Sequence, residues 1–182
     1  MNGSESGQIA RVRIGHGYDL HRLEPVDAAA GSNRGGRPLM LGGIRFDSPV
    51  GPVGHSDGDA LFHAITDGLL GALGLDDIGT LFPDDDPAND GRASIDFVRE
   101  ALRRVQKAGY AVGNIDCTVI LERPRLKEHR GRLREAIATA LGVGIERVNI
   151  KGKSHEGVDA IGEGRAIEVH VVVLLERLEE VS

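Results

Sequence analysis

The chain has 182 residues, no Trp and only 3% aromatic residues, so it is long enough for one domain with an aliphatic core. Its net charge of −6 argues against nucleic-acid binding, and no apolar run is long enough for a transmembrane helix. The single cysteine, Cys117, excludes an intramolecular disulfide and a multi-cysteine zinc site. A reducing, cytoplasmic location is therefore expected, and any metal site must use His and carboxylates.

Residues 1–10 are expected to form a disordered leader and residues 11–178 a single domain. Apolar residues recur at strand or helix spacing along this domain. The predicted strands are residues 11–23, 39–46 (a strand or hairpin arm), 112–121, 148–151 and 167–175, and the predicted helices are residues 56–75, 94–108 and 127–141. Residues 24–38 and 77–90 are rich in turn-forming and acidic residues and are predicted loops. Because strands and helices alternate, the predicted fold class is mixed α/β.

Three residues suggest a metal site. Asp19 and His21 are two positions apart on a predicted strand, so their side chains share a face. His63 belongs to the helix predicted at 56–75. Its neighbours there are apolar, so His63 does not fit the interpretation that this helix simply exposes an acidic face to solvent. One carboxylate and two imidazoles with an open fourth position are typical of catalytic zinc. The alternative is an exposed polar pair on a strand edge and a capped helix.

The start of the same helix offers a second kind of site. His55 and Ser56 precede the first turn, where free N–H groups bind anions. Ser56 with Asp59 resembles a capping box. Asp59 and Asp67 each lie one turn from His63, so either is a candidate partner for orienting its imidazole. A capped helix with a solvated acidic face is the competing interpretation.

Two loops carry further polar groups. The acidic residues 77–86 form a turn that suits ribose hydroxyls or a hard cation, unless it is simply solvated. Residues 151–165 combine Lys, Ser, His and Glu with four glycines between two predicted strands. Such a loop can wrap phosphates through backbone N–H groups, or serve as an ordinary flexible connection.

The chain resembles the 2-C-methyl-D-erythritol 2,4-cyclodiphosphate synthase family in three stretches. These are RIGHGYDLH at residues 13–21, GHSDGDALFHAITDGLLGALGLDDIGTLFPDDDP at 54–87 and KAGYAVGNIDCTVILERPRL at 107–126. The resemblance runs from about Arg13 to Leu175, and several separate motifs occur in order and in register. It favours the metal-site interpretation over the alternatives above.

The resemblance implies an activity and an assembly. A phosphorus–oxygen lyase of this family converts 4-diphosphocytidyl-2-C-methyl-D-erythritol 2-phosphate to the 2,4-cyclodiphosphate and CMP, in non-mevalonate isoprenoid biosynthesis. Zn²⁺ and a second ion, Mg²⁺ or Mn²⁺, hold the diphosphate. The implied fold is a single α/β (α+β) domain with a mixed, four-stranded-type sheet covered by helices on one side. It assembles as a homotrimer with active sites between neighbouring subunits, and no nucleic acid or membrane is a partner.

The resemblance also assigns roles to individual residues. Asp19, His21 and His63 match the zinc ligands, and Glu156 matches the ligand of the second divalent ion. His55 and Ser154 match the catalytic positions that stabilise the transition state and contact the phosphates. The positions that match substrate contacts are Ser56, Asp77, Gly79, Phe82, Asp84, Asp86, Pro124, Arg125 and Leu126.

The loop at residues 151–165 departs from the family pattern. Ser154 and Glu156 keep the hydroxyl and the carboxylate, but Asp159-Ala160 replaces a usual Gly-Phe. Glu163 and Arg165 exchange the usual Arg and Glu, which predicts an ion pair of reversed polarity near the trimer axis. Arg125 stands where many members have Lys, and this exchange preserves charge but not geometry.

Two other functions fit the same residues. A zinc-dependent phosphohydrolase would use the same three ligands with water as nucleophile and release inorganic phosphate or an open-chain product. A non-catalytic nucleotide- or metal-binding trimer would have no need for the second metal ligand, Glu156. The synthase is the leading hypothesis.

Overall fold

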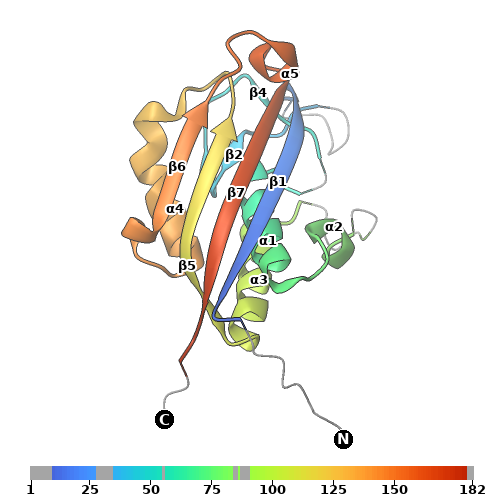
Figure 1. Ribbon diagram of the computed structural model, residues 1–182. Coiled ribbons are helices and arrows are strands. Elements are labelled where there is room, and N and C mark those ends of the chain that lie inside the picture. Colours follow the sequence, from blue (N-terminus) through green and yellow to red (C-terminus); the bar gives the residue numbers. More distant parts are fainter. Residues whose placement is uncertain (1–9, 28–34, 55, 84–85, 87–90, 180–182) are drawn as a thin grey trace, which may run out of the picture.

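The structure is a computed structural model that describes residues 10–27, 35–54, 56–83, 86 and 91–179 (Figure 1). Its strands are β1 (Val12–Pro25), β2 (Met40–Leu41), β3 (Ile44–Arg45), β4 (Val50–Pro52), β5 (Tyr110–Ile120), β6 (Val148–Lys153) and β7 (Ala166–Arg177). Its helices are α1 (Ala60–Leu73), α2 (Ile78–Leu81), α3 (Ile95–Lys107), α4 (Arg130–Leu141) and α5 (Asp159–Gly162), with 3₁₀ turns at Leu126–His129 and Ile145–Arg147. In this described part of the chain, no helix is long and apolar enough to cross a membrane.

The main sheet has five strands in the order β4-β1-β7-β5-β6. The β5–β6 pair is parallel and the other pairs are antiparallel, so the sheet is mixed, as predicted. The prediction of four strands is wrong by one, because β4 is only three residues long and shows no periodic pattern. The predicted strand at 39–46 forms a separate hairpin, β2–β3, which turns at Gly42-Gly43 with positive φ angles.

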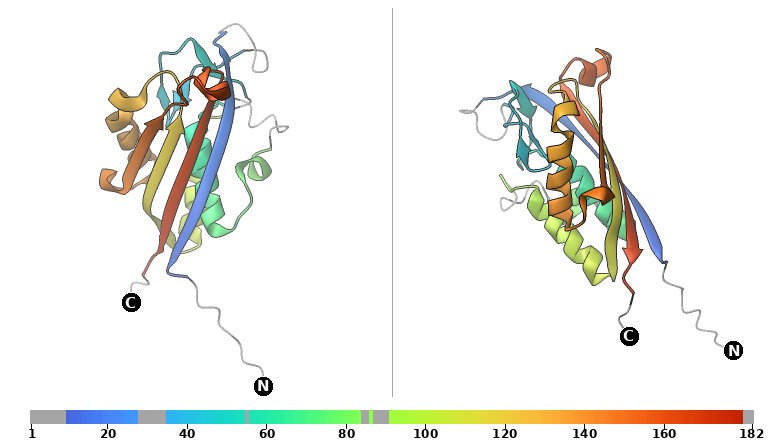
Figure 2. Two further views of the ribbon diagram at one scale, coloured as in Figure 1. Left: turned by 45° about the horizontal axis from the view of Figure 1, so that its top comes forward. Right: turned by 90° about the vertical axis from the view of Figure 1, so that its left-hand side faces the viewer.

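Within the described residues, the helices that pack on the sheet cover one of its faces, as predicted. α1, α3 and α4 lie side by side on that face, and α5 lies at one end of the sheet (Figure 2). Along β7, alternate residues from Ile167 to Leu175 are buried against the helices. The opposite face of β1 and β7 is open and carries apolar side chains: Ile14 is 68% exposed, Leu20 51% and Val172 46%. This open face is called the bare sheet face below, and it consists of Val12, Ile14, Tyr18, Leu20 and Val172 together with the polar His16, Glu168 and His170.

Two glycines on β1 let α1 lie directly on the sheet. A Cβ atom added at Gly15 would lie 1.9 Å from the Gly68 carbonyl oxygen, and one at Gly17 would lie 1.7 Å from the Ala64 carbonyl oxygen. Any side chain at these positions would collide with the helix backbone. The close approach brings His63 of α1 next to Asp19, two residues beyond Gly17.

Replacing Gly17 by Ala is expected to lower the free energy of unfolding by about 3 kcal/mol, because the added methyl group displaces α1 from the sheet. Urea unfolding measures this change. Gly131→Ala is the matched control: a Cβ at Gly131 in α4 meets nothing within 4 Å, so stability should be unchanged or rise by up to about 1 kcal/mol. A Gly17→Ala protein as stable as the parent chain would contradict the close-approach interpretation.

Helix α1 starts later than predicted, and its cap is not Ser56. The N-cap is Asp59, which is fully buried and accepts hydrogen bonds from Phe62 N at 3.1 Å, Gly42 N at 2.9 Å and Gly43 N at 2.6 Å. Burial raises the pKa of Asp59, while these three N–H groups act in the opposite direction. The predicted capping box is therefore wrong, because Asp59 also serves the β2–β3 turn, which needs a buried acceptor.

A short helix lies in each of the two polar loops predicted at residues 77–86 and 151–165. α2 follows Asp77, whose carboxylate accepts a hydrogen bond from Thr80 N at 2.8 Å. α5 interrupts residues 151–165 and begins after Val158. Each is four residues long, too short to produce a periodic pattern of apolar residues.

Candidate functional site

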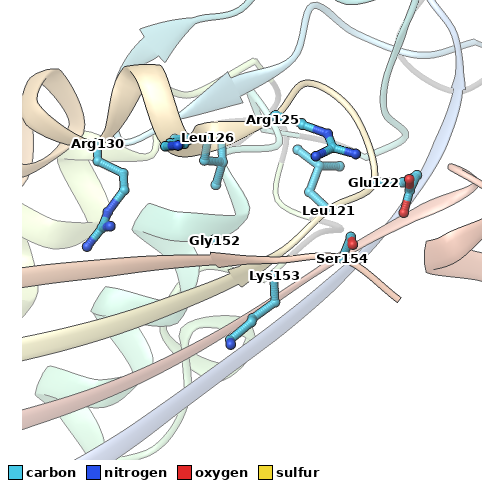
Figure 3. A pocket seen from close by; sticks show the side chains of 9 residues that line it. Leu121, Glu122, Arg125, Leu126, Arg130, Gly152, Lys153 and Ser154 are labelled. Atoms are coloured by element: carbon cyan, nitrogen blue, oxygen red, sulfur yellow. The ribbon is translucent and has the colours of Figure 1, made fainter. Parts of the chain in front are cut away.

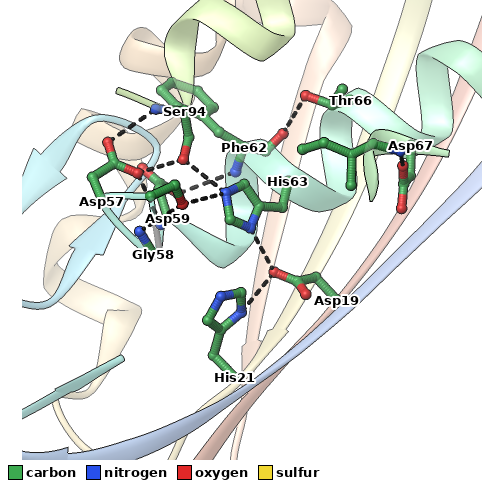
Figure 4. Close-up of polar contacts among 12 residues, drawn as sticks. Asp19, His21, Asp57, Gly58, Asp59, Phe62, His63, Thr66, Asp67 and Ser94 are labelled. Carbon is green, nitrogen blue, oxygen red and sulfur yellow. Dashed lines mark hydrogen bonds and ion pairs between the residues drawn. The ribbon is translucent and has the colours of Figure 1, made fainter. Parts of the chain in front are cut away.

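Strand β1 and helix α1 bring together the three predicted metal ligands. Asp19 and His21 alternate onto the same face of β1, and His63 lies one turn into α1 (Figure 4). The Oδ2 atom of Asp19 is 2.9 Å from Nδ1 of His21 and 3.3 Å from Nδ1 of His63. One donor atom from each residue lies within 4.8 Å of the other two, and all three side chains are half-buried. We call this group the triad.

The donor atoms of the triad fit a divalent metal ion. Asp19 Oδ2 and His21 Nδ1 are buried and have no hydrogen-bond partner of acceptable geometry, although they are close to each other. Buried polar atoms are rarely left without partners, so a site that keeps two of them is suited to a ligand. A carboxylate and two imidazoles are a donor set that zinc and related divalent ions accept.

Charge is concentrated at the triad. Burial by itself would raise the pKa of Asp19, but the adjacent imidazoles of His21 and His63 outweigh it and lower the pKa to about 2. Burial by itself would lower the pKa of His63, but the Asp19 carboxylate outweighs it and raises the pKa. The site therefore holds a carboxylate between two imidazoles, an arrangement that favours a cation at their meeting point.

His63 is oriented by two hydroxyl groups. Its Nε2 atom is 2.8 Å from Ser94 Oγ and 3.1 Å from Ser56 Oγ. The partners proposed from the sequence are wrong: Asp59 caps α1, and Asp67 accepts a hydrogen bond from Ile78 N at 2.8 Å. Ser94 is 31 residues from His63 in the chain, and no local spacing signals their contact.

A cavity of about 320 Å³ opens beside the triad. Ser56, Gly79 and Phe82 line it, as expected of substrate-binding residues, and Phe97 is a further wall that the sequence did not suggest. Asp77 does not line this cavity; its carboxylate binds Thr80 at the start of α2. Asp86 is described but is not part of the wall, and the remaining predicted residues here, His55 and Asp84, lie outside the described residues.

A second cavity of about 330 Å³ lies where β5 and β6 end (Figure 3). Of the predicted residues, Arg125, Leu126 and Ser154 line it, and Pro124 directly precedes Arg125. The lining is predominantly basic, which sequence reasoning did not predict: it contains Arg125, Lys127, Arg130 and Lys153 against one acidic residue, Glu122. Basic groups around a cavity suit an anionic ligand such as a nucleotide.

The predicted second metal ligand lies apart from both cavities. Glu156 is exposed, lies between β6 and α5, and has a positive φ angle of 51°. The predicted ion pair in the same loop is present: Arg165 Nε donates to Glu163 Oε2 at 2.7 Å on an exposed part of the surface. Its expected place near a trimer axis stays a prediction.

The two cavities share no residue. The triad cavity lies against β1 and α1, whereas the basic cavity lies at the ends of β5 and β6. β7 separates β1 from β5 in the sheet (Figure 1). The residues expected to contact one substrate therefore fall into two groups within a single chain.

The fold and the site define an α/β protein with a candidate metal centre beside a cavity. The model of the YgbB family matches residues 12–176, and the chain belongs to that family, as its three motifs indicate. The chain is 48% identical over 163 residues to the chloroplastic 2-C-methyl-D-erythritol 2,4-cyclodiphosphate synthase of Arabidopsis thaliana, covering 90% of this chain and 66% of that protein. It is 46% identical over 170 residues to the synthase of Rhodopirellula baltica, covering 93% of this chain and 96% of that protein.

A solved structure gives the same result for the fold. The structure described as IspF (Plasmodium falciparum) CDP complex has a TM-score of 0.78 and 37% identity to this chain, and the match covers 92% of this chain and 97% of that one. The chain thus spans about two thirds of the plant relative's length and nearly all of the bacterial one's. The predicted family and α/β fold class are confirmed.

Proposed function

We propose that the chain converts 4-diphosphocytidyl-2-C-methyl-D-erythritol 2-phosphate to 2-C-methyl-D-erythritol 2,4-cyclodiphosphate and CMP by intramolecular phosphoryl transfer. Family membership and relatives bearing the name of this synthase support the proposal. The single observation that carries it is the convergence of Asp19, His21 and His63 beside a cavity. The relatives described above all bear the name of the synthase, which favours it over a phosphohydrolase or a non-catalytic binding protein.

Phosphoryl transfer requires the protein to position the reacting groups and neutralise their charge, and it requires no covalent bond to the protein. The attacking 2-phosphate and the diphosphate that it attacks are both anionic, so the protein must hold them together although they repel each other. In our proposal Ser56 and Phe82 hold the methylerythritol end in a near-attack geometry, and Gly79 contacts the ribose. Arg125, Leu126 and Ser154 hold the cytidine and its phosphates in the basic cavity. Zn²⁺ at the triad and Mg²⁺ or Mn²⁺ at Glu156 would neutralise the diphosphate when bound.

We further propose a homotrimer in which each active site combines the triad cavity of one subunit with the basic cavity of its neighbour. Two observations support it. The two cavities are separate within one chain, and the bare sheet face exposes apolar side chains that a monomer would leave in water. A ring of three chains would bury this face and bring unlike cavities together through head-to-tail contacts.

Replacing Ile14 by Glu is expected to convert the trimer to monomers, because burying an added carboxylate between subunits costs several kcal/mol. Light scattering during size-exclusion chromatography measures the mass. Ile145→Glu is the matched control, since Ile145 is 39% exposed in a 3₁₀ turn away from the bare sheet face and its variant should keep the parent mass. An Ile14→Glu protein of unchanged mass would rule out the bare sheet face as the interface.

Phosphorus NMR of the zinc-loaded protein with substrate and magnesium tests the activity. The synthase yields a pair of cyclic diphosphate signals together with CMP. Inorganic phosphate or an open-chain product would instead identify a phosphohydrolase. Unchanged substrate in the presence of bound zinc would favour the non-catalytic alternative and overturn the proposal.

A further inference from the structure

Ser94 occupies a position that its role in the helix does not explain. It is the N-cap residue of α3, yet its side chain makes no capping hydrogen bond. Serine is common at N-caps because its hydroxyl usually accepts a hydrogen bond from the first turn. Here the residue is fully buried, and its hydroxyl lies between Asp57 and His63 (Figure 4). The Ser94 hydroxyl therefore interacts with Asp57 and His63 and does not cap α3.

Asp57 fixes the direction of the hydrogen bonds. Its Oδ1 atom accepts from the Ser94 hydroxyl and from Asp59 N at 3.2 Å, and its Oδ2 atom accepts from Ser94 N at 3.0 Å. A carboxylate can only accept hydrogen bonds, and a serine hydroxyl has one proton to give. Because Ser94 gives that proton to Asp57, its oxygen can only accept from Nε2 of His63, which lies 2.8 Å away.

We propose that Asp57 and Ser94 form a positioning relay that keeps the proton of His63 on Nε2. The opposite ring atom, Nδ1, is the one that faces Asp19 Oδ2 at 3.3 Å. With Nε2 protonated, the neutral imidazole presents its lone pair at Nδ1, where a metal ligand requires it. Ser56 Oγ, 3.1 Å from the same Nε2 atom, accepts a hydrogen bond from Gly58 N and lies on the same side of the ring.

The relay rests on the metal site of the proposed function and adds two residues to it. Neither Asp57 nor Ser94 lines the triad cavity, so both act through His63. Hydrogen-bond partners of metal-binding histidines typically change metal affinity 10–100-fold when they are removed. The relay is therefore expected to determine metal affinity more strongly than it determines folding.

Zinc titration of the metal-free protein by calorimetry tests the relay. Ser94→Ala is expected to weaken Zn²⁺ binding by roughly 10–100-fold, whereas Ser94→Thr, which keeps the hydroxyl, should restore most of the affinity. Thr66→Val is the matched control: Thr66 of α1 is also fully buried, but its hydroxyl donates to Phe62 O at 2.8 Å and not to the triad. Its zinc affinity should equal that of the parent chain.

Nitrogen NMR of the imidazoles measures which ring nitrogen of His63 carries the proton. This tautomer would not change if Asp57 and Ser94 only stabilised the fold. In alkaline, metal-free buffer the Asp19 carboxylate at Nδ1 competes with the Ser94 oxygen at Nε2 for the His63 proton, and the relay predicts a larger Nε2-protonated share in the parent protein than in Asp57→Asn. Asp57→Asn should lower that share in the orientation whose amide oxygen accepts from Ser94 N: its NH₂ group then replaces Oδ1, gives up the hydrogen bond from Asp59 N and donates to Ser94 Oγ, so the Ser94 proton turns to Nε2. The proton of His63 then moves to Nδ1, and zinc binding weakens.

The outcomes separate the relay from the metal site. A parent chain that binds no zinc would overturn both the relay and the metal site of the proposed function. A parent chain that binds zinc, with Ser94→Ala and Asp57→Asn binding equally well and the His63 tautomer unchanged, would overturn the relay alone. Loss of affinity in both variants with a shifted tautomer in Asp57→Asn supports it. If Ser94→Ala fails to fold, the Asp57→Asn spectrum still decides the question.

Discussion

Asp19→Asn is expected to lower kcat by about 10³-fold, since charge stabilisation by a bound metal contributes several kcal/mol and each 1.36 kcal/mol is tenfold. Asp19 is the residue through which His21 and His63 meet, at 2.9 and 3.3 Å from its Oδ2 atom. Asparagine keeps the shape but removes the charge that two imidazoles surround. Metal content measured on the purified variant should fall together with the rate.

Asp96→Asn is the control for this change. Asp96 is an exposed carboxylate of α3 that pairs with Arg99 at 2.8 Å, so its loss changes net charge by the same amount without touching the triad. Surface ion pairs contribute little, and the control should keep both metal and rate. If Asp19→Asn retained full metal content and full activity, the triad would not be the metal site that the reaction uses.

The triad could be predicted from the sequence because each part of it follows from a local rule. Alternation along a strand places Asp19 and His21 together, and helical spacing places His63 among apolar neighbours. What brings strand and helix into contact is less visible, although Gly15 and Gly17 are the residues that allow it. Their role depends on the backbone of α1, which no pattern within β1 reveals.

The features that the sequence did not predict depend on contacts between distant segments. Ser94 binds His63 from the start of another helix, and the basic cavity joins residues 121–130 to residues 152–154. Strand β4 exists because Pro52 pairs with Leu23 across the chain, and three residues are too few for a periodic signal. The misplaced cap has a similar cause, since Asp59 is fixed by Gly42 and Gly43 as much as by its own helix.

Trimers that mix subunits of two inactive variants are expected to regain part of the parent activity. Asp19→Asn damages the triad cavity, and Arg125→Ala with Ser154→Ala damages the basic cavity, which shares no residue with the first. In a head-to-tail ring, a site is intact when an undamaged triad faces an undamaged basic cavity. Random assembly of equal amounts gives this pairing at about a quarter of all sites, but every mixed ring of three contains it once, so co-expressed, doubly tagged hybrids should show about a third of the parent rate.

Mixing Asp19→Asn with His63→Ala is the control, because both changes damage the same cavity and no pairing repairs it. Hybrids of the first kind that are no more active than either variant alone would place each whole active site within one chain. That result would require a single subunit to join cavities that β7 keeps apart, which its sheet order does not allow without a large rearrangement. Restored activity would instead explain why the chain leaves an apolar sheet face bare: the face holds together subunits that cannot catalyse the reaction alone.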